Sequence, residues 1–103
     1  MWEPYKKGFR AWLQLEKSLS DNSVEAYLSD VEKLTQYLNQ KKINGSPSDL
    51  KLKDLQQFVK WIAGLGITAS SQARIISGIK SFYKYCFTEK ISDQDPTALL
   101  EAP

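Results

Sequence analysis

The sequence predicts an all-α fold: a compact bundle of four amphipathic helices, closed by a short C-terminal helix or linker. Apolar residues recur at intervals of three and four along most of the chain, as they do on one face of a helix. No segment shows the strict apolar–polar alternation of a half-buried strand. A length of 103 residues allows one hydrophobic core, and the 42% hydrophobic and 25% charged residues are ordinary for a folded domain.

Two helices are predicted before residue 43. The first covers residues 3–19, where Tyr5, Phe9 and Trp12 share one face. The second follows Ser20, whose hydroxyl can accept a hydrogen bond from a free amide of the first turn. Its apolar positions keep the helical period: Val24, Tyr27, Leu28, Val31, Leu34 and Leu38. After this helix, the stretch "INGSPSD" gathers turn-forming residues and predicts a loop.

Two more helices are predicted in the second half of the chain. Apolar residues keep the helical spacing over residues 52–65, and the glycines of "GLGI" can take the left-handed conformation that ends a helix. The fourth helix runs from Ala69 for about five turns, with Ser70 or Ser71 available as its cap. Its apolar face consists of Ile75, Ile76, Ile79, Phe82, Tyr83 and Cys86.

The C-terminal segment "SDQDPTALLEAP" carries a shorter pattern. Asp95 can cap a helix, and Pro96 suits a first helical position because its missing amide hydrogen has no helical partner there. A short apolar run follows before the terminal proline. We expect either a brief fifth helix or a linker.

The residue types exclude several classes of protein. Cys86 is the only cysteine and histidine is absent, so an internal disulfide, the usual metal sites and Ser-His or Cys-His nucleophile pairs cannot form. We therefore expect no catalysis by this chain and no metal or other cofactor. No apolar run approaches the roughly 18 residues that cross a bilayer, and "MWEPYKKGFR" lacks the apolar centre of a secretory signal. These features predict a cytoplasmic protein without a membrane partner.

The fourth predicted helix has an unusual distribution of charge. No acid occurs between Asp54 and Glu89, while the basic residues Lys60, Arg74, Lys80 and Lys84 lie within that window. At about 100° per residue, one narrow stripe opposite the apolar face holds Ser70, Arg74, Ser77, Ser81 and Lys84. Small hydroxyl side chains let a helix approach a groove closely, and arginine can pair with two acceptors of a guanine. The pattern indicates a helix that faces nucleic acid, although a merely solvated surface has the same residue types.

The start of the second predicted helix is similar. Asn22, Ser23 and Ala26 are small or polar and lie near an N-terminus whose free amides attract phosphate. Ser23 has an alternative role in starting the helix. The later acids of the same helix argue against a phosphate-facing surface along its whole length.

Two stretches, "LSDNSVEAYLSDVEKLTQYL" and "SSQARIISGIKSFYKYCFTEKISDQDPTALLEAP", resemble the N-terminal core-binding domain of tyrosine recombinases, the phage-integrase family, in particular its Xer branch. The family's second helix reads approximately Leu-Ser-x-Asn-Thr-x-x-x-Tyr-x-x-Asp-Leu, matched here by Leu19, Ser20, Asn22, Ser23, Tyr27, Asp30 and Val31. Its fourth helix and its Asp-Pro-x-x-x-Leu ending are matched by Arg74, Ser77, Lys80, Phe82, Tyr83, Asp95, Pro96 and Leu100.

This resemblance implies a SAM-like helical DNA-binding domain over residues 1–92. Helices two and four would lie across the major groove at the recombination core site, beside the point of cleavage. The residues expected at DNA are Asn22, Ser23, Ala26, Arg74, Ser77, Lys80, Ser81 and Lys84. Leu28 and Ser29 depart from the family pattern, because many relatives carry arginine there, so phosphate contacts at these positions look depleted.

The resemblance also implies a longer parent protein. Residues 93–103 would be the linker to a C-terminal catalytic domain that lies outside this chain, so the chain alone is not an enzyme. Its partners would be duplex DNA, the catalytic domain of the same parent chain and other recombinase protomers in a synaptic tetramer. Whether the parent resolves chromosome dimers for chromosome segregation, integrates a mobile element or inverts a promoter stays open.

Two other functions fit the same surface. A helical protein–protein interaction domain could use the small residues of the fourth helix to pack closely against a partner helix. A single-strand binder could use exposed aromatic residues as stacking platforms. Salt dependence and a preference for duplex would separate these functions, because phosphate binding weakens steeply as ionic strength rises.

Overall fold

The computed structural model describes residues 1–102 and contains four α-helices. Their bounds are α1 Glu3–Leu15, α2 Asp21–Gln40, α3 Leu52–Ala63 and α4 Ala69–Thr88, with a 3-10 turn, η1, at Pro47–Asp49. No strand occurs in the part of the chain that the structure describes, which confirms the all-helical prediction. Within residues 1–102, no helix is both long enough and apolar enough to cross a membrane.

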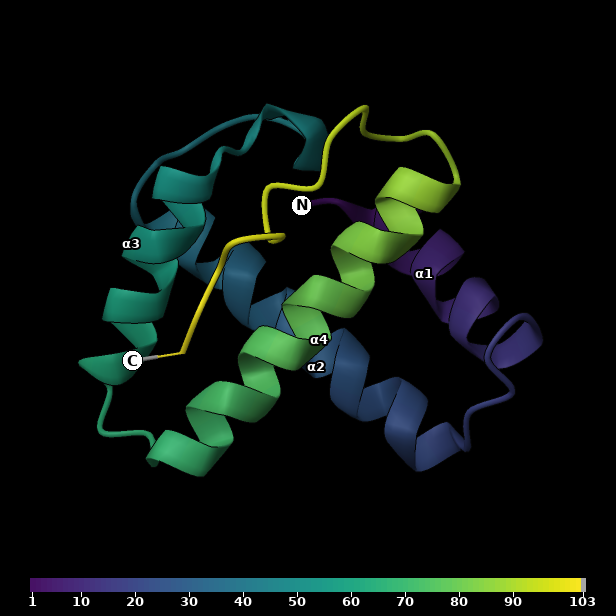
Figure 1. The fold of residues 1–103 in the computed structure, drawn as a ribbon, viewed down its shortest axis with the longest axis horizontal. Coiled ribbons are helices and arrows are strands. Elements are labelled where there is room, and N and C mark those ends of the chain that lie inside the picture. Colours follow the sequence, from purple (N-terminus) through teal and green to yellow (C-terminus); the bar gives the residue numbers. More distant parts are fainter. Residues whose placement is uncertain (103) are drawn as a thin grey trace.

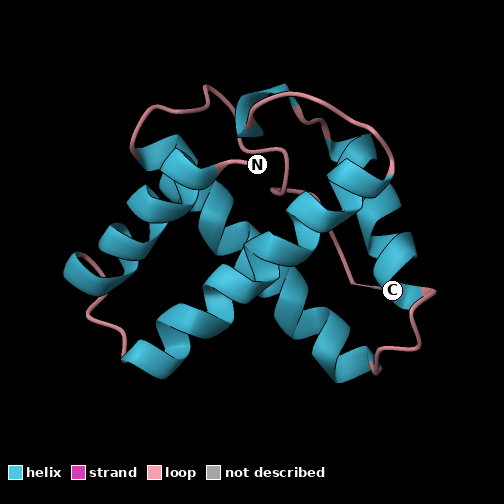
Figure 2. Ribbon diagram, turned by 180° about the vertical axis from the view of Figure 1, so that it is seen from behind, coloured by secondary structure: helices cyan, strands magenta, loops and turns pink. Residues whose placement is uncertain are grey.

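The two long helices, α2 and α4, cross each other at the centre of the molecule (Figure 1). Helix α1 lies on one side of this crossing and α3 on the other, as the view from behind also shows (Figure 2). The first residues of α2 and of α4 both lie at the lower edge of Figure 1, where the two helices diverge. The N-terminal ends of the two crossing helices therefore share one edge of the molecule.

The apolar faces predicted from the sequence meet in one core around the Phe82 ring. Phe82 contacts Trp2, Phe9 and Tyr83, with ring centroids 5.8, 5.3 and 5.4 Å apart. Edge-to-face and offset ring pairs of this kind favour a defined arrangement of the elements that carry them. The largest fully buried side chains come from all four helices and from the C-terminal segment: Phe9, Leu13, Leu34, Leu38, Leu55, Phe58, Ile62, Ile79, Phe82, Tyr83 and Leu100.

The crossing of α2 and α4 is close because Gly78 has no side chain. An added Cβ at Gly78 would overlap the Asp30 carboxylate and would lie 2.6 Å from its Cγ and 2.8 Å from its Cβ. Asp30 of α2 is buried directly over the α4 backbone at this point. Gly78, which in sequence lies beside the polar stripe of the fourth helix, is therefore buried in the helix interface.

The helix ends follow the expected chemistry with two corrections. Ser20 caps α2 as predicted, accepting a hydrogen bond from the Ser23 amide at 3.3 Å. The predicted cap of α4, Ser70 or Ser71, is wrong: Thr68 is the cap, because its Oγ1 accepts from the Ser71 amide at 3.3 Å. Helix α1 ends at Leu15 and not at residue 19, because Ser18 takes a left-handed conformation with φ 52°.

The C-terminal segment forms turns, so of the two predicted alternatives the fifth helix is absent from the described residues. Asp95 does act as a cap, since its Oδ1 accepts from the amide and the hydroxyl of Thr97 at 2.9 and 2.6 Å. The turn covers only residues 96–99, too few to offset the unfavourable nucleation of a helix. Leu100 is nevertheless only 2% exposed and packs into the core.

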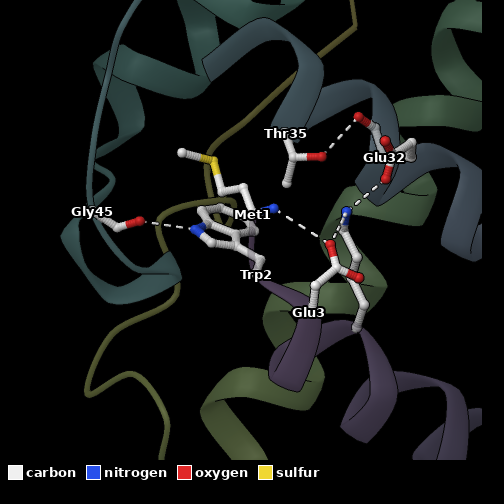
Figure 3. A network of polar contacts seen from close by, with 7 residues as sticks. Met1, Trp2, Glu3, Glu32, Thr35 and Gly45 are labelled. Atoms are coloured by element: carbon white, nitrogen blue, oxygen red, sulfur yellow. Dashed lines mark hydrogen bonds and ion pairs between the residues drawn. The ribbon is translucent and has the colours of Figure 1, made fainter. Parts of the chain in front are cut away.

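The N-terminus is fastened to the loop between α2 and η1 (Figure 3). The Trp2 indole donates a hydrogen bond to the Gly45 carbonyl at 2.8 Å while its ring stacks on Phe82. Within the core, the Tyr83 hydroxyl donates to the Pro47 carbonyl at 2.8 Å. Trp2 therefore holds this loop at the N-terminus, and Tyr83 holds the following η1 turn against α4.

We predict that Gly78→Ala destabilises the domain by about 1–3 kcal/mol, because the added methyl group must displace Asp30 or separate α2 from α4. The free energy of unfolding is measured by urea titration, followed by circular dichroism at the helical band.

Gly64→Ala is the matched control. Gly64 has an ordinary φ of −71°, and an added Cβ would meet only backbone oxygens at 3.4 and 3.7 Å. Its unfolding free energy should change by less than about 0.5 kcal/mol. Equal stability of Gly78→Ala and the wild type would show that the close crossing does not constrain the fold.

Candidate nucleic-acid interface

The eight residues predicted to face DNA lie on two helices, and we call their surface the candidate interface. Asn22, Ser23 and Ala26 lie on the first two turns of α2, whereas Arg74, Ser77, Lys80, Ser81 and Lys84 lie on α4. The first turns of both helices lie at the same edge of the molecule (Figure 1). Lys80, Ser81 and Lys84 belong to later turns of α4, beyond the contact with α2 at Gly78. Ser23, Ala26 and Ser81 are half-buried, and the other five are exposed.

The two helix N-termini at this edge differ in their electrostatics. The free amides of a first turn carry partial positive charge and attract anions. Asp21 offsets this charge in the first turn of α2, whereas the first turn of α4 contains no acid. The start of α4 is therefore the more favourable of the two for a phosphate group.

Arg74 is held by a bidentate ion pair across the helix crossing. Its Nη1 donates to Asp30 Oδ2 at 3.1 Å, and its Nη2 donates to Asp30 Oδ1. The Asp30 side chain is 1% exposed, whereas that of Arg74 is 52% exposed. One edge of the guanidinium is therefore bound to Asp30 of α2, while about half of the Arg74 side chain is exposed to solvent.

Asp30 changes the interpretation of the acid-free stretch. Residues 55–88 contain no acid, but the fold places the Asp30 carboxylate of α2 against Arg74, which lies 44 residues later in the sequence. A signal for this did exist, because Asp30 falls between Tyr27 and Leu34 at helical spacing, on the apolar face of α2. A single acid on an apolar face requires a basic partner from another element.

Burial raises the pKa of the Asp30 carboxyl above its usual value of 3.8. The hydrogen bonds and the positive charge of Arg74 act in the opposite direction and favour the ionised form, as does the charge of Lys33. The net pKa is raised because loss of hydration outweighs these contributions. The ionised carboxylate is therefore stabilised chiefly by Arg74 and to a smaller extent by Lys33.

Two of the later acids of α2, whose charge would oppose a phosphate-facing surface, form ion pairs with α1. Glu25 pairs with Arg10 of α1 at 2.8 Å, and Glu32 pairs with Lys6 of α1 at 2.5 Å. Both pairs join α1 to α2, so the charges of Glu25 and Glu32 are offset by two bases of α1. Within residues 1–102, neither Lys80 nor Lys84 of α4 takes part in an ion pair.

The reactive side chains of the core are unsuited to nucleophilic chemistry. Burial strongly raises the pKa of the Tyr83 hydroxyl, which is fixed as a donor to Pro47. Burial also raises the pKa of the Cys86 thiol to about 12. Because a thiolate is the nucleophilic form of cysteine, Cys86 acts here as a small apolar core residue.

Residues 7–90 match the family model described as "Phage integrase, N-terminal SAM-like domain". The chain belongs to this family. The resemblance inferred from the two stretches of sequence is thereby confirmed, and the helix crossing that carries the candidate interface is the centre of a SAM-like domain.

Several curated relatives of this SAM-like domain carry the name tyrosine recombinase XerD. The protein from Rhizobium meliloti is 31% identical over 99 residues, which cover 96% of this chain and 31% of the relative. That from Staphylococcus saprophyticus is 37% identical over 92 residues, covering 89% and 31%. That from Chlorobaculum tepidum is 31% identical over 104 residues, covering 98% and 34%. The chain therefore spans about a third of the length of these relatives.

We predict that Arg74→Gln destabilises this SAM-like domain by about 1–3 kcal/mol at neutral pH, because it leaves a buried carboxylate without its ionic partner. The variant should also raise the pKa of Asp30 further, since both contributions of Arg74 lower it. The pKa is measured by an NMR titration of the Asp30 carboxyl carbon.

The loss of stability should depend on pH. A carboxyl with a raised folded-state pKa binds its proton more tightly in the folded than in the unfolded chain, so stability falls as pH rises through the folded-state pKa. Arg74→Gln should therefore be closer to the wild type near pH 4 than near pH 7. Arg74→Lys, which keeps the charge, should lose less stability. An equal loss at both pH values would contradict this role for Asp30.

Proposed function

We propose that this domain binds duplex DNA at a recombination core site, as the core-binding part of a site-specific tyrosine recombinase. In this proposal α2 and α4 lie across the major groove and present the candidate interface to it. The observation that carries the proposal is the uncompensated charge of α4. Helix α4 itself contains no acid, and its Lys80 and Lys84 are free of ion pairs within the described residues. In α1, by contrast, Lys6 and Arg10 are paired with acids of α2.

Each type of side chain in the candidate interface has its own role. Lys80 and Lys84 contact phosphates, which gives affinity without sequence information. Asn22, Ser23, Ala26, Ser77 and Ser81 are small, so the helix backbones can come close to the groove, and the polar members can donate hydrogen bonds to phosphates or bases. Arg74 carries the donors best suited to a base edge.

Strand cleavage and exchange belong to the catalytic domain of the parent protein, to which residues 93–103 lead. That assignment is supported by the share of the XerD relatives that this chain covers. The further partners are that catalytic domain and other recombinase protomers in a synaptic tetramer. In this proposal the SAM-like domain itself has the task of binding DNA.

We predict that the domain binds a labelled duplex in fluorescence anisotropy with an affinity that falls steeply with salt. Lys80→Gln and Lys84→Gln should each reduce the slope of log affinity against log salt by about 1, because each removes one phosphate contact. An equal-length single strand should bind more weakly than the duplex.

Lys41→Gln is the matched control, since Lys41 is an exposed lysine that follows the last turn of α2 and is not part of the candidate interface. Its salt slope should equal that of the wild type. If the domain fails to bind duplex at low salt, the proposal is wrong, and a protein partner becomes the better explanation of the small-residue surface. A preference for the single strand would favour base stacking instead.

A further inference from the structure

We infer that Asp30 is a positioning residue for DNA recognition: it holds Arg74 as part of a nearly neutral pair that reads a base edge. Sequence preference then comes from this pair, and affinity from the charges of Lys80 and Lys84. The inference rests on the proposed function, and adds to it a buried residue of α2 and a division of roles within the candidate interface.

The geometry leaves Arg74 with donors to spare. A guanidinium has five N–H groups, of which Asp30 takes one from each terminal nitrogen. The Nε–H and one hydrogen on each terminal nitrogen remain. The Nε–H and a neighbouring terminal N–H lie on one edge of the plane and can donate together to two acceptors, such as O6 and N7 of guanine. The Arg74 side chain is 52% exposed, so a ligand can approach it from solvent.

The position of Arg74 is fixed before any ligand arrives. Asp30 cannot withdraw, because it is buried between α2 and the Gly78 backbone of α4. Its two carboxylate oxygens define the plane and the direction of the guanidinium fork. Much of the rotamer freedom that arginine loses on binding is therefore already lost in the free domain.

The charge of the pair also differs from that of its neighbours. The Asp30 carboxylate offsets most of the positive charge of Arg74, so the pair attracts phosphate weakly and releases few counterions on binding. Lys80 and Lys84 have no such partner within residues 1–102. A fixed, nearly neutral set of donors, on the same helix as two unpaired cations, suits base recognition better than phosphate attraction.

Asp30→Asn tests the inference, since asparagine keeps the size and one acceptor oxygen of Asp30 but removes its charge. The 103-residue chain is first selected against a randomised duplex library to find its preferred sequence. Affinities for that duplex and for a scrambled one are then measured at several salt concentrations. We expect the ratio of the two affinities to fall about tenfold in Asp30→Asn, because Arg74 is no longer held, and the salt slope to steepen by about 1.

Glu25→Gln is the matched control: it also removes an α2 carboxylate from an arginine pair, but that arginine, Arg10, lies on α1. It should leave the affinity ratio unchanged. If Asp30→Asn does not fold by circular dichroism, Arg74→Lys takes its place, with the ratio expected to fall at an unchanged salt slope.

Two results would overturn the inference alone: duplex binding by the wild type without sequence preference, or a preference that survives in the folded variant. Failure of the wild type to bind any duplex at low salt would overturn the proposed function together with the inference.

Discussion

The close contact of α2 and α4 at Gly78 is the constraint on which the rest of the structure depends. A residue without a side chain lets Asp30 lie against the α4 backbone, and in that position its carboxylate contacts Arg74. The crossing in turn brings the starts of both helices to one edge of the molecule (Figure 1). The missing side chain of Gly78 thus allows both the close packing of the two longest helices and the contact of Asp30 with Arg74.

The distribution of ion pairs gives this crossing its electrostatic character. A net charge of +2 is too small to indicate a nucleic-acid partner by itself. Arg10 and Lys6 of α1 are paired with acids of α2, and Arg74 of α4 is paired with Asp30. The other two bases of α4, Lys80 and Lys84, are unpaired within the described residues, and α4 contains no acid of its own. The positive character of α4 therefore comes from Lys80 and Lys84, because Asp30 neutralises its third base, Arg74.

Most of the fold could be predicted from the sequence because it follows local rules. Helical periodicity located all four helices, and the Ser20 cap and the buried Cys86 were found from residue type and position. The errors arose where several local solutions compete: Thr68 and two serines can each cap α4, and the left-handed Ser18 ends α1 early. The pairing of Asp30 with Arg74 could not be predicted, since it spans 44 residues and depends on the helix crossing.

Arg74 belongs to the fold and to the candidate interface at once, and this limits what substitutions there can reveal. Replacing it with glutamate would place a second carboxylate against the buried Asp30, so lost binding could reflect lost structure. Asp30 separates the two roles better, because its side chain is 1% exposed and has almost no surface of its own to offer a ligand. An effect of Asp30 on DNA preference in a folded variant must therefore act through the orientation of Arg74.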